Sequence, residues 1–234
     1  MKHSKRYNNA YAQYDRQKRY DLDEALKLLK SLPATKFDET VEVHFNLGVD
    51  PRKADQQIRN SLVLPHGTGK VTRVLVFAEG DKAEEAKKAG ADYVGLDDLM
   101  EKITAGWFDF DVVITMPSLM GRIGKLGRVL GPRGLMPNPK VGTVTMDIGK
   151  AVEEAKGGKI AYRVDKFGNL HIVFGKISFP DEKLKDNLKA VLAAVLKDRP
   201  PTMKGVYIKS ITLCTTMGPG IKVQVASATL EAKS

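Results

Sequence analysis

The strongest constraint on the fold is a change of pattern near Val71, where short apolar runs begin to alternate with amphipathic segments. The apolar runs are VTRVLVF, ADYVG and DFDVVITM, and the amphipathic segments are DKAEEAKKAG, DDLMEKITAG, SLMGRIGKLGRVL and DIGKAVEEAKGG. Strands that alternate with helices form βαβ units, in which helices cover both faces of a parallel sheet. We therefore predict a Rossmann-like three-layer α/β domain over residues 67–159.

On both sides of this segment the pattern is typical of an antiparallel sheet. Val41–Val49 alternates apolar and polar side chains, which predicts a strand with one buried face. Further strands are predicted in SLVLPHGTGK, GVYIKSITLCTT, IKVQVASATL and IAYRVDKFGNLHIVFG, the last as two strands around a turn at 165–169. Helices are predicted after Asp21, where Glu24 completes a capping box, after Asp50-Pro51 and after Pro180.

The two flanks are predicted to fold together. Residues 1–66 alone offer too few elements to bury a sheet, and the strands of residues 160–234 need a partner. The predicted fold is therefore a split α+β domain, made of residues 1–66 and 160–234, with the α/β domain of residues 67–159 inserted in it. Glycines near both crossings, at 67–70 and 157–159, make hinge motion between the domains plausible.

Charge indicates an anionic partner. The 234 residues carry a formal net charge of +10, of which +3 lies in residues 1–66, +1 in 67–159 and +6 in 160–234. The basic groups therefore gather on the split domain. Residues 1–20 combine Lys and Arg with tyrosines, and two interpretations stay open: an arm that orders on nucleic acid, or a solubilising tail or short surface helix.

One stretch of the middle segment is unusual for its lack of acidic residues. Gly121–Thr143 holds six glycines, three prolines and five Lys or Arg, and no Asp or Glu occurs between Asp111 and Asp147. A glycine-rich basic loop can lie close against a polyanion, although a solvated connector has the same composition. Gly121, Gly124 and Gly127 recur every three residues, which on a helix predicts a bare stripe for close backbone approach.

Motifs for catalysis, cofactors and metals are missing from the sequence. HGTGK at 66–70 lacks the first glycine and the Ser or Thr of a phosphate-binding loop, and the dinucleotide motif G-x-G-x-x-G does not occur. The four histidines, at 3, 44, 66 and 171, lack metal-ligand spacing, and the single cysteine, Cys214, is predicted to pack in a strand. We predict a protein that is not an enzyme and uses no cofactor or metal; the alternative is a nucleotide-binding enzyme using the inserted domain.

Neither a secretory signal nor an apolar run long enough to span a bilayer occurs, so we predict no membrane contact. Three stretches of the flanks, at 36–42, 163–168 and 215–222, mix hydroxyls or charges with a glycine or an aromatic at a strand end. Each alone is ordinary turn chemistry, but together on a basic β domain they form a candidate RNA-reading surface.

Five motifs carry a resemblance to a known family. GPRGLMPNPKVGTV, TTMGP, KFDETVEVH, LGVDPRK and LPHGTGK together resemble the bacterial family of large-subunit ribosomal protein one, which forms the side stalk. The resemblance runs from about residue 20 to residue 228. Two positions depart from the family pattern: Val164 replaces an asparagine, and Gly220 follows Pro219.

The resemblance implies a two-domain protein, cytoplasmic and ribosome-associated, that is a monomer when free. It implies binding to the rRNA stalk, assistance in the release of deacylated tRNA from the exit site, and repression of translation of its own operon mRNA. The family's RNA contacts are expected at Lys36, Phe37, Thr40, Glu42, Arg163, Asp165, Lys166, Gly168, Ser210, Thr215, Thr216, Met217 and Gly218. The basic loop, through Arg133 and Lys140, is expected near the domain junction or at a secondary RNA contact.

Overall fold

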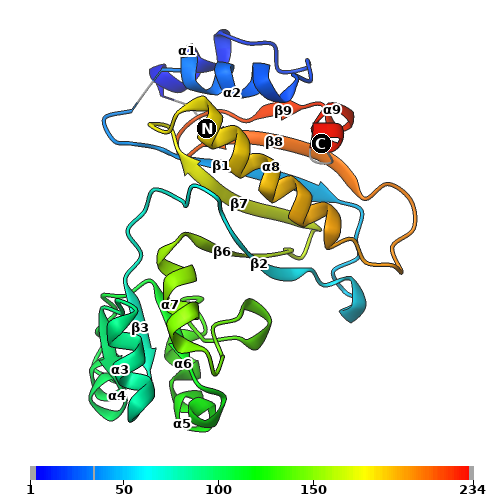
Figure 1. Cartoon of the computed structure of the whole chain (residues 1–234). Helices are drawn as coiled ribbons and strands as arrows, with labels where there is room; N and C mark the ends of the chain where they lie inside the picture. The colour runs from blue at the N-terminus through cyan, green and yellow to red at the C-terminus, as the bar shows by residue number, and fades with distance from the viewer. Residues whose placement is uncertain (1–3, 34, 232–234) are drawn as a thin grey trace. The chain divides into compact units, whose positions relative to one another are not determined.

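The computed structural model describes residues 4–33 and 35–231, and it divides the chain into two compact units. The first unit combines residues 1–69 with residues 162–234, and the second consists of residues 70–161 (Figure 1). None of the described helices is both long and apolar enough to cross a membrane. Of the N-terminal arm, the structure describes the residues from Ser4 onward, so His3 lies outside the described residues.

A four-stranded antiparallel sheet forms the centre of the first unit. Its strand order is β7-β1-β8-β9, so the early strand β1 lies between two strands from the C-terminal part of the chain (Figure 1). The strands are β1 (Thr40–Leu47), β7 (Asn169–Lys176), β8 (Ile208–Thr215) and β9 (Ile221–Val223). Burial alternates along β1, with the odd-numbered residues from Val41 to Leu47 buried and the even-numbered ones partly exposed. The sheet therefore has one core face and one open face, the latter formed on β1 by Thr40, Glu42, His44 and Asn46.

Helices cover the core face of this sheet. The first unit contains α1 (Lys5–Ala12), α2 (Leu22–Ser31), the short 3-10 turn η1 (Ala54–Gln56), α8 (Asp181–Lys197) and α9 (Val225–Glu231). Helix α8 begins after Pro180, which suits the first turn of a helix, and its buried leucines and valines pack over β7 and against α2.

The buried side chain of Asn187 fastens a loop to the core of the first unit. Its Oδ1 accepts a hydrogen bond from the His66 N–H at 3.0 Å. Its Nδ2 donates to the carbonyl oxygens of Gly67 at 2.9 Å and Phe174 at 2.8 Å. Asn187 is fully buried, so one buried side chain pairs three backbone groups, of which the bond to Phe174 is buried and the other two are partly buried.

Several predicted details of the first unit differ from the structure. Asp21 precedes α2, but its side chain makes no capping hydrogen bond, so the capping box is not formed. The predicted last strand ends at Val223 and is followed by α9, and the helix expected after Pro51 is only the turn η1. The two strands expected around the turn at 165–169 do not pair with each other. The first of them, β6 (Lys159–Arg163), instead forms a two-stranded sheet with β2 (Arg59–Val63), and the second, β7, pairs with β1.

The second unit is built on a parallel sheet of strand order β4-β3-β5. Its strands are β3 (Val74–Phe77), β4 (Tyr93–Gly95) and β5 (Val112–Thr115), and its longer helices are α3 (Asp81–Lys88), α4 (Asp97–Thr104) and α7 (Ile148–Lys156). Every residue of β3 is buried, because apolar side chains pack on both faces of the sheet. Val74 and Val76 join one cluster with α3 and α7, whereas Leu75 and Phe77 join a second cluster with α4.

The segment predicted as a helix over 118–130 is helical from 117 to 130, but it alternates between short 3-10 and α segments and is not one regular α-helix. The segments are η2 (Pro117–Leu119), α5 (Met120–Ile123), η3 (Gly124–Leu126) and α6 (Gly127–Leu130), and a further turn, η4 (Pro139–Val141), follows. Ile123, Leu126 and Leu130 are buried in the cluster under the parallel sheet. Gly121, Gly124 and Gly127 face open space, since a Cβ at any of these positions would meet no described atom within 4 Å outside its own helical segment, so no backbone within the described chain uses this bare stripe.

Asp111 lies just before β5 and pairs with Lys70 and Arg73, which lie just before β3. We expect this carboxylate to make the stability of the second unit depend on pH. Its carboxylate accepts hydrogen bonds from Lys70 Nζ at 2.6 Å and from the Arg73 N–H at 3.1 Å. Partial burial acts to raise the pKa of Asp111, but the hydrogen bonds from Lys70 and Arg73 outweigh it and lower the pKa to about 2. The stability that Asp111 contributes is therefore complete above its ordinary pKa of 3.8 and is lost as the pH falls toward 2.

We expect Asp111→Asn to lower the free energy of unfolding of the second unit by about 2 kcal/mol at pH 7, and by nearly nothing at pH 2. The measurement is urea unfolding followed by the fluorescence of Trp107, the single tryptophan, which packs in this unit. Asp109→Asn is the matched control, because the Asp109 side chain is 69% exposed and lies 3.6 Å from Arg73. A difference between Asp111→Asn and the unchanged protein that is constant from pH 7 to pH 2 would contradict this account.

Candidate nucleic-acid interface

The residues that the family resemblance predicts as the main RNA contacts lie in the first unit, in two groups at opposite ends of β1. Lys36, Phe37, Thr40 and Glu42 lead into or begin β1, and they meet the end of β8 because Val41 pairs with Thr215. At the other end, Asn46 pairs with both Asn169 and Ser210, which places Ser210 beside the turn at 165–168. A strand of eight residues spans about 26 Å, so the structure brings each group together but not the two groups with each other.

The first group centres on the loop between β8 and β9, which is fastened to the start of β1. The Thr40 N–H donates to Thr216 Oγ1 at 3.0 Å, and the Thr216 N–H donates to the Thr40 carbonyl at 3.1 Å. Thr215 is buried, whereas the Met217 side chain is 54% exposed. A Cβ on Gly218 would lie 2.3 Å from Thr215 Oγ1, so this position excludes any side chain. Thr216 and Gly218 therefore shape the loop, and Met217 is the side chain that the loop presents.

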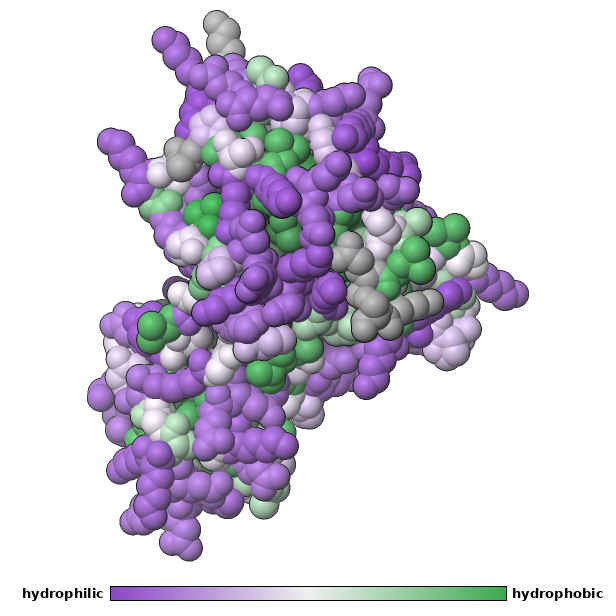
Figure 2. Space-filling view, turned by 45° about the horizontal axis from the view of Figure 1, so that its top comes forward, coloured by the Kyte–Doolittle hydropathy of each residue, from purple (hydrophilic) through white to green (hydrophobic). Residues whose placement is uncertain are grey.

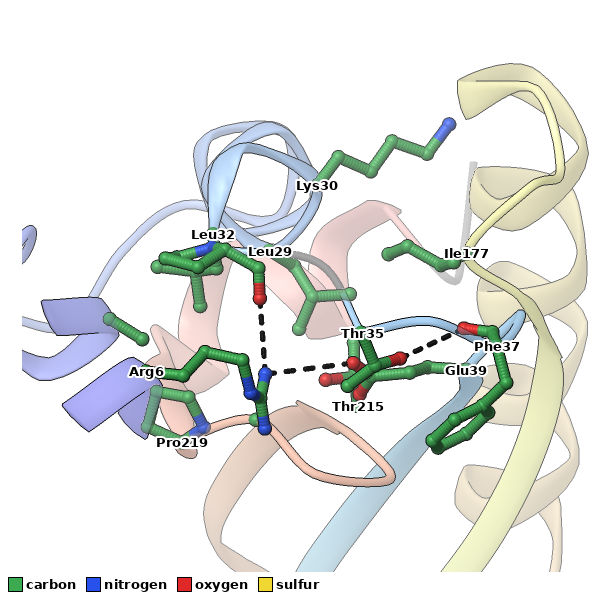
Figure 3. A pocket seen from close by; sticks show the side chains of 13 residues that line it. Arg6, Leu29, Lys30, Leu32, Thr35, Phe37, Glu39, Ile177, Thr215 and Pro219 are labelled. Atoms are coloured by element: carbon green, nitrogen blue, oxygen red, sulfur yellow. Dashed lines mark hydrogen bonds and ion pairs between the residues drawn. The ribbon is translucent and has the colours of Figure 1, made fainter. Parts of the chain in front are cut away.

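Two residues that the sequence patterns did not single out, Glu39 and Arg6, hold this loop from inside. Glu39 is 4% exposed, and its Oε2 accepts a hydrogen bond from the Met217 N–H at 3.0 Å. Arg6 of α1 lies 3.7 Å from Glu39 and donates to the carbonyls of Met217 at 2.7 Å and Pro33 at 3.0 Å. Figure 3 shows Arg6 and Glu39 directed toward each other, with the Phe37 ring turned away from them. Both backbone polar groups of Met217 are thus held by one ion pair, in which Glu39 is buried and Arg6 is partly exposed.

The environment of Glu39 favours its charged form. Burial acts to raise the pKa of Glu39, but hydrogen bonds from Thr215 and the Met217 N–H, with the nearby Arg6 charge, outweigh it and hold the pKa below its ordinary value. The pocket around these groups has a volume of about 50 Å³, room for a few water molecules and not for a nucleobase. A base cannot enter this pocket, so the part of the group open to a ligand is the surface with the exposed side chains of Phe37 and Met217. Glu39 lies two residues before Val41 and so follows the same alternation that buries Val41 and Val43. This alternation is the feature of the sequence that could have indicated a buried Glu39.

The second group is a turn built by Asp165 and Gly168. Asp165 accepts hydrogen bonds from the N–H groups of Phe167 at 2.8 Å and Asn169 at 2.7 Å. Burial acts to raise the pKa of Asp165, but the hydrogen bonds from Asn169 and Phe167 outweigh it, so its pKa lies below the ordinary value. Gly168 has a φ of 82°, and a Cβ there would lie 3.1 Å from the Leu47 carbonyl oxygen. Asp165 and Gly168 thus form the turn.

The exposed residues of this second group supply its charge and polarity. Arg163, Lys166 and Ser210 are all exposed, and none of them is needed to form the turn. The Phe167 side chain is 84% exposed, an aromatic surface beside two cations that the sequence analysis did not include among the RNA contacts. An exposed ring next to Arg and Lys is suited to stacking on an unpaired base.

Between the two groups, a histidine pair occupies the open face of the sheet. His44 Nδ1 lies 2.8 Å from His171 Nδ1, and His44 Nε2 lies 3.0 Å from Cys214 Sγ. Burial and the neighbouring His171 hold the pKa of His44 below its ordinary value. Burial and the nearby Glu42 and Glu39 raise the pKa of Cys214 to about 11, so its thiol is protonated at neutral pH. The cysteine predicted to pack in a strand is thus partly exposed and paired with a histidine.

The two residues predicted for a secondary contact, Arg133 and Lys140, are exposed and lie in the second unit. The Arg133 guanidinium stacks over the Phe108 ring at 3.8 Å from its centre. Lys140 follows Asn138, whose side chain accepts the Lys140 N–H at 2.8 Å and so fixes the local turn.

Comparison with known proteins decides the family. The family model described as "Ribosomal protein L1p/L10e family" matches residues 28–219, more than half of the chain. The chain belongs to this family. It is also 59% identical over 232 residues to "Large ribosomal subunit protein uL1" of Thermobifida fusca (strain YX), covering 99% of this chain and 98% of that protein. The predicted family is thereby confirmed. Members of the L1 family are structural ribonucleoprotein components, so the protein is not an enzyme, and the nucleotide-dependent alternative has no support.

Proposed function

We propose that the protein is a structural rRNA-binding component of the large ribosomal subunit that binds the side-stalk rRNA through its first unit. The observation that carries this proposal is the loop at 215–218, whose backbone is fixed by Thr40, Glu39 and Arg6 while Met217 is presented to solvent. A surface fixed before binding loses little conformational freedom on contact, which favours recognition of a folded RNA. Membership of the L1 family and the +9 charge of the two flanking segments support the same partner.

Each group of residues has a separate part in the proposed contact. Phe37 and Met217 form an exposed apolar surface against which a base or sugar can pack, and Lys36 lies beside them. Arg163 and Lys166 at the far end of β1 meet phosphates, so the RNA follows the open face from one end to the other. Figure 2 shows that hydrophilic side chains cover most of the face in view, with smaller groups of apolar side chains between them.

We further propose the finer roles that the family resemblance implies. The second unit is a Rossmann-like insert that adds a secondary contact through Arg133 and Lys140, while the split unit carries most of the affinity. The protein assists release of deacylated tRNA from the exit site and represses its own operon by binding a similar structure on the messenger. Sedimentation with ribosomes separates this function from that of a repressor that never joins them: the protein should sediment with the large subunit.

The test of RNA binding is Thr216→Val, which keeps the shape of the side chain and removes its hydroxyl. We expect the loop to lose the side-chain half of its two hydrogen bonds with Thr40 and the affinity for a stalk-RNA fragment to fall about tenfold, equivalent to about 1.4 kcal/mol. Filter binding measures the affinity, with an unrelated hairpin as the competing RNA. Lys183→Ala, which removes one exposed charge on α8, is the control and should cost less than about threefold.

Salt dependence is the second readout of the same experiment. The affinity of the unchanged protein should fall steeply with salt, and Thr216→Val should leave the slope unchanged because it removes no charge. Equal losses for Thr216→Val and Lys183→Ala would show that the 215–218 loop does not recognise the RNA.

A further inference from the structure

Three side chains with metal-binding atoms meet on the open face of the first unit. Glu42 and His44 are two residues apart on β1 and so point to the same side, and Cys214 lies opposite Glu42 on β8. Their ligand atoms all lie within 4.8 Å of one another. His44 Nε2 is 3.0 Å from Cys214 Sγ and 3.7 Å from Glu42 Oε2. The pairing register of the sheet, which is rigid, sets this arrangement.

The second ring nitrogen of His44, Nδ1, makes the kind of hydrogen bond that orients a metal-binding histidine. His44 Nδ1 lies 2.8 Å from His171 Nδ1, and His171 Nε2 lies 3.8 Å from Asp165 Oδ2. A histidine that binds a metal through one ring nitrogen almost always uses the other nitrogen in a hydrogen bond, which fixes the tautomer and the ring orientation. Here His171, itself directed toward a carboxylate, provides that hydrogen bond and leaves Nε2 facing Cys214 and Glu42.

We propose that Glu42, His44 and Cys214 form a binding site for a zinc ion, with one coordination position open to solvent or to a ligand. Zn²⁺ accepts one thiolate, one imidazole and one carboxylate at about 2.0–2.3 Å, whereas Mg²⁺ and Ca²⁺ require oxygen ligands. Tetrahedral coordination at those lengths places ligand atoms roughly 3.2–3.8 Å apart. The distances from His44 to its two neighbours, 3.0 and 3.7 Å, lie close to that range, so small side-chain rotations complete the site.

Binding has a defined proton balance. The Cys214 thiol gives its proton to solvent as sulfur bonds to the metal, while His44 and Glu42 coordinate in the neutral imidazole and carboxylate forms. The site takes up one Zn²⁺ and releases one proton, with no oxidation or reduction. Because Glu42 is also a proposed RNA contact, a metal ion there lies on the path of the bound RNA.

The test uses the full chain freed of metal by a chelator and titrated with Co²⁺, which occupies zinc sites and absorbs visibly. We expect one Co²⁺ per chain, with a thiolate-to-cobalt charge-transfer band that Zn²⁺ abolishes by displacement. Cys214→Ser should remove the band, and His44→Gln should weaken Co²⁺ binding by about tenfold or more. His66→Gln is the matched control, because His66 pairs with Asp186 at 3.1 Å and belongs to no such group; it should bind like the unchanged protein.

A second measurement needs no variant and no RNA, so its outcome is separate from that of the proposed RNA binding. The rate at which a thiol reagent labels Cys214, the only cysteine, should fall at least about tenfold with one equivalent of Zn²⁺ and stay unchanged with Mg²⁺. Labelling that is indifferent to Zn²⁺, or a cobalt band that survives Cys214→Ser, would overturn the site.

Discussion

Glu39→Ala should lower the free energy of unfolding of the first unit by about 3 kcal/mol and weaken stalk-RNA binding by at least about tenfold. The substitution removes the acceptor of the Met217 N–H and leaves the Arg6 guanidinium without its carboxylate partner. It also opens a gap beside the buried Thr215. The loop at 215–218 then keeps its contacts with Thr40 and the bond from Arg6 to the Met217 carbonyl, but the Met217 N–H is no longer held, so the loop geometry is less tightly fixed before RNA arrives.

Two measurements separate these effects. Urea unfolding followed by circular dichroism gives the stability, and filter binding at a temperature where the variant is fully folded gives the affinity. Glu24→Ala is the matched control, since Glu24 forms an exposed pair with Lys18 at 3.4 Å that contributes at most about 1 kcal/mol. If Glu39→Ala destabilises the protein but binds RNA with unchanged affinity, Glu39 supports the fold alone and the preformed loop is not needed for recognition.

Asn187→Leu should be the most destabilising of the substitutions considered for the first unit. Leucine has a similar volume but removes the partner of the buried Phe174 carbonyl and of the partly buried His66 N–H and Gly67 carbonyl. An unpaired buried group costs about 1–3 kcal/mol and a partly buried one less, so we expect a total loss of about 4 kcal/mol. Hydrogen exchange of the β7 amides measures it, because those amides exchange by opening of this unit.

The comparison for this second prediction is Asn60→Leu. Asn60 is exposed and donates to Asp198 at 2.9 Å, so its loss should cost less than about 1 kcal/mol. Trp107 fluorescence follows the second unit in the same samples and should show an unchanged transition. A loss below about 1 kcal/mol for Asn187→Leu would mean that water replaces the missing hydrogen bonds.

The sequence predicts elements well where a single periodicity dominates. The alternation from Val41 to Val49 corresponds to β1, and the apolar positions after Pro180 correspond to the buried side of α8. Residues 225–230 were wrongly predicted as part of a strand because Val225 continues the alternation of IKVQV, whereas the alanines and leucine after it favour a helix. Such patterns do not predict which strands pair with each other. No local feature of the sequence indicates that β6 pairs with β2 while β7 pairs with β1.

For the site, the sequence indicates which residues take part, but not which of them shape the loops and which are exposed to a partner. Gly168 and Gly218 were predicted as contacts, and the structure shows that close packing against Leu47 and Thr215 also requires glycine there. Glu39 was missed because an acidic residue beside Asp38 looks solvated until its phase with Val41 is considered. Arg6 acts on a loop 211 positions away, and no local pattern encodes such a partner.

The position of β1 between β7 and β8 has a consequence for the order of events during translation. Residues 40–47 leave the ribosomal exit tunnel long before residues 208–215 are made, whereas residues 70–161 are contiguous and can fold as soon as they emerge. A nascent chain halted before residue 215 has β1 with one edge unpaired and lacks the Thr216 anchor altogether. If the proposed function holds, the chain can therefore bind stalk RNA only after residue 216 has been made, and a nascent chain halted before that point does not compete with finished copies for the RNA.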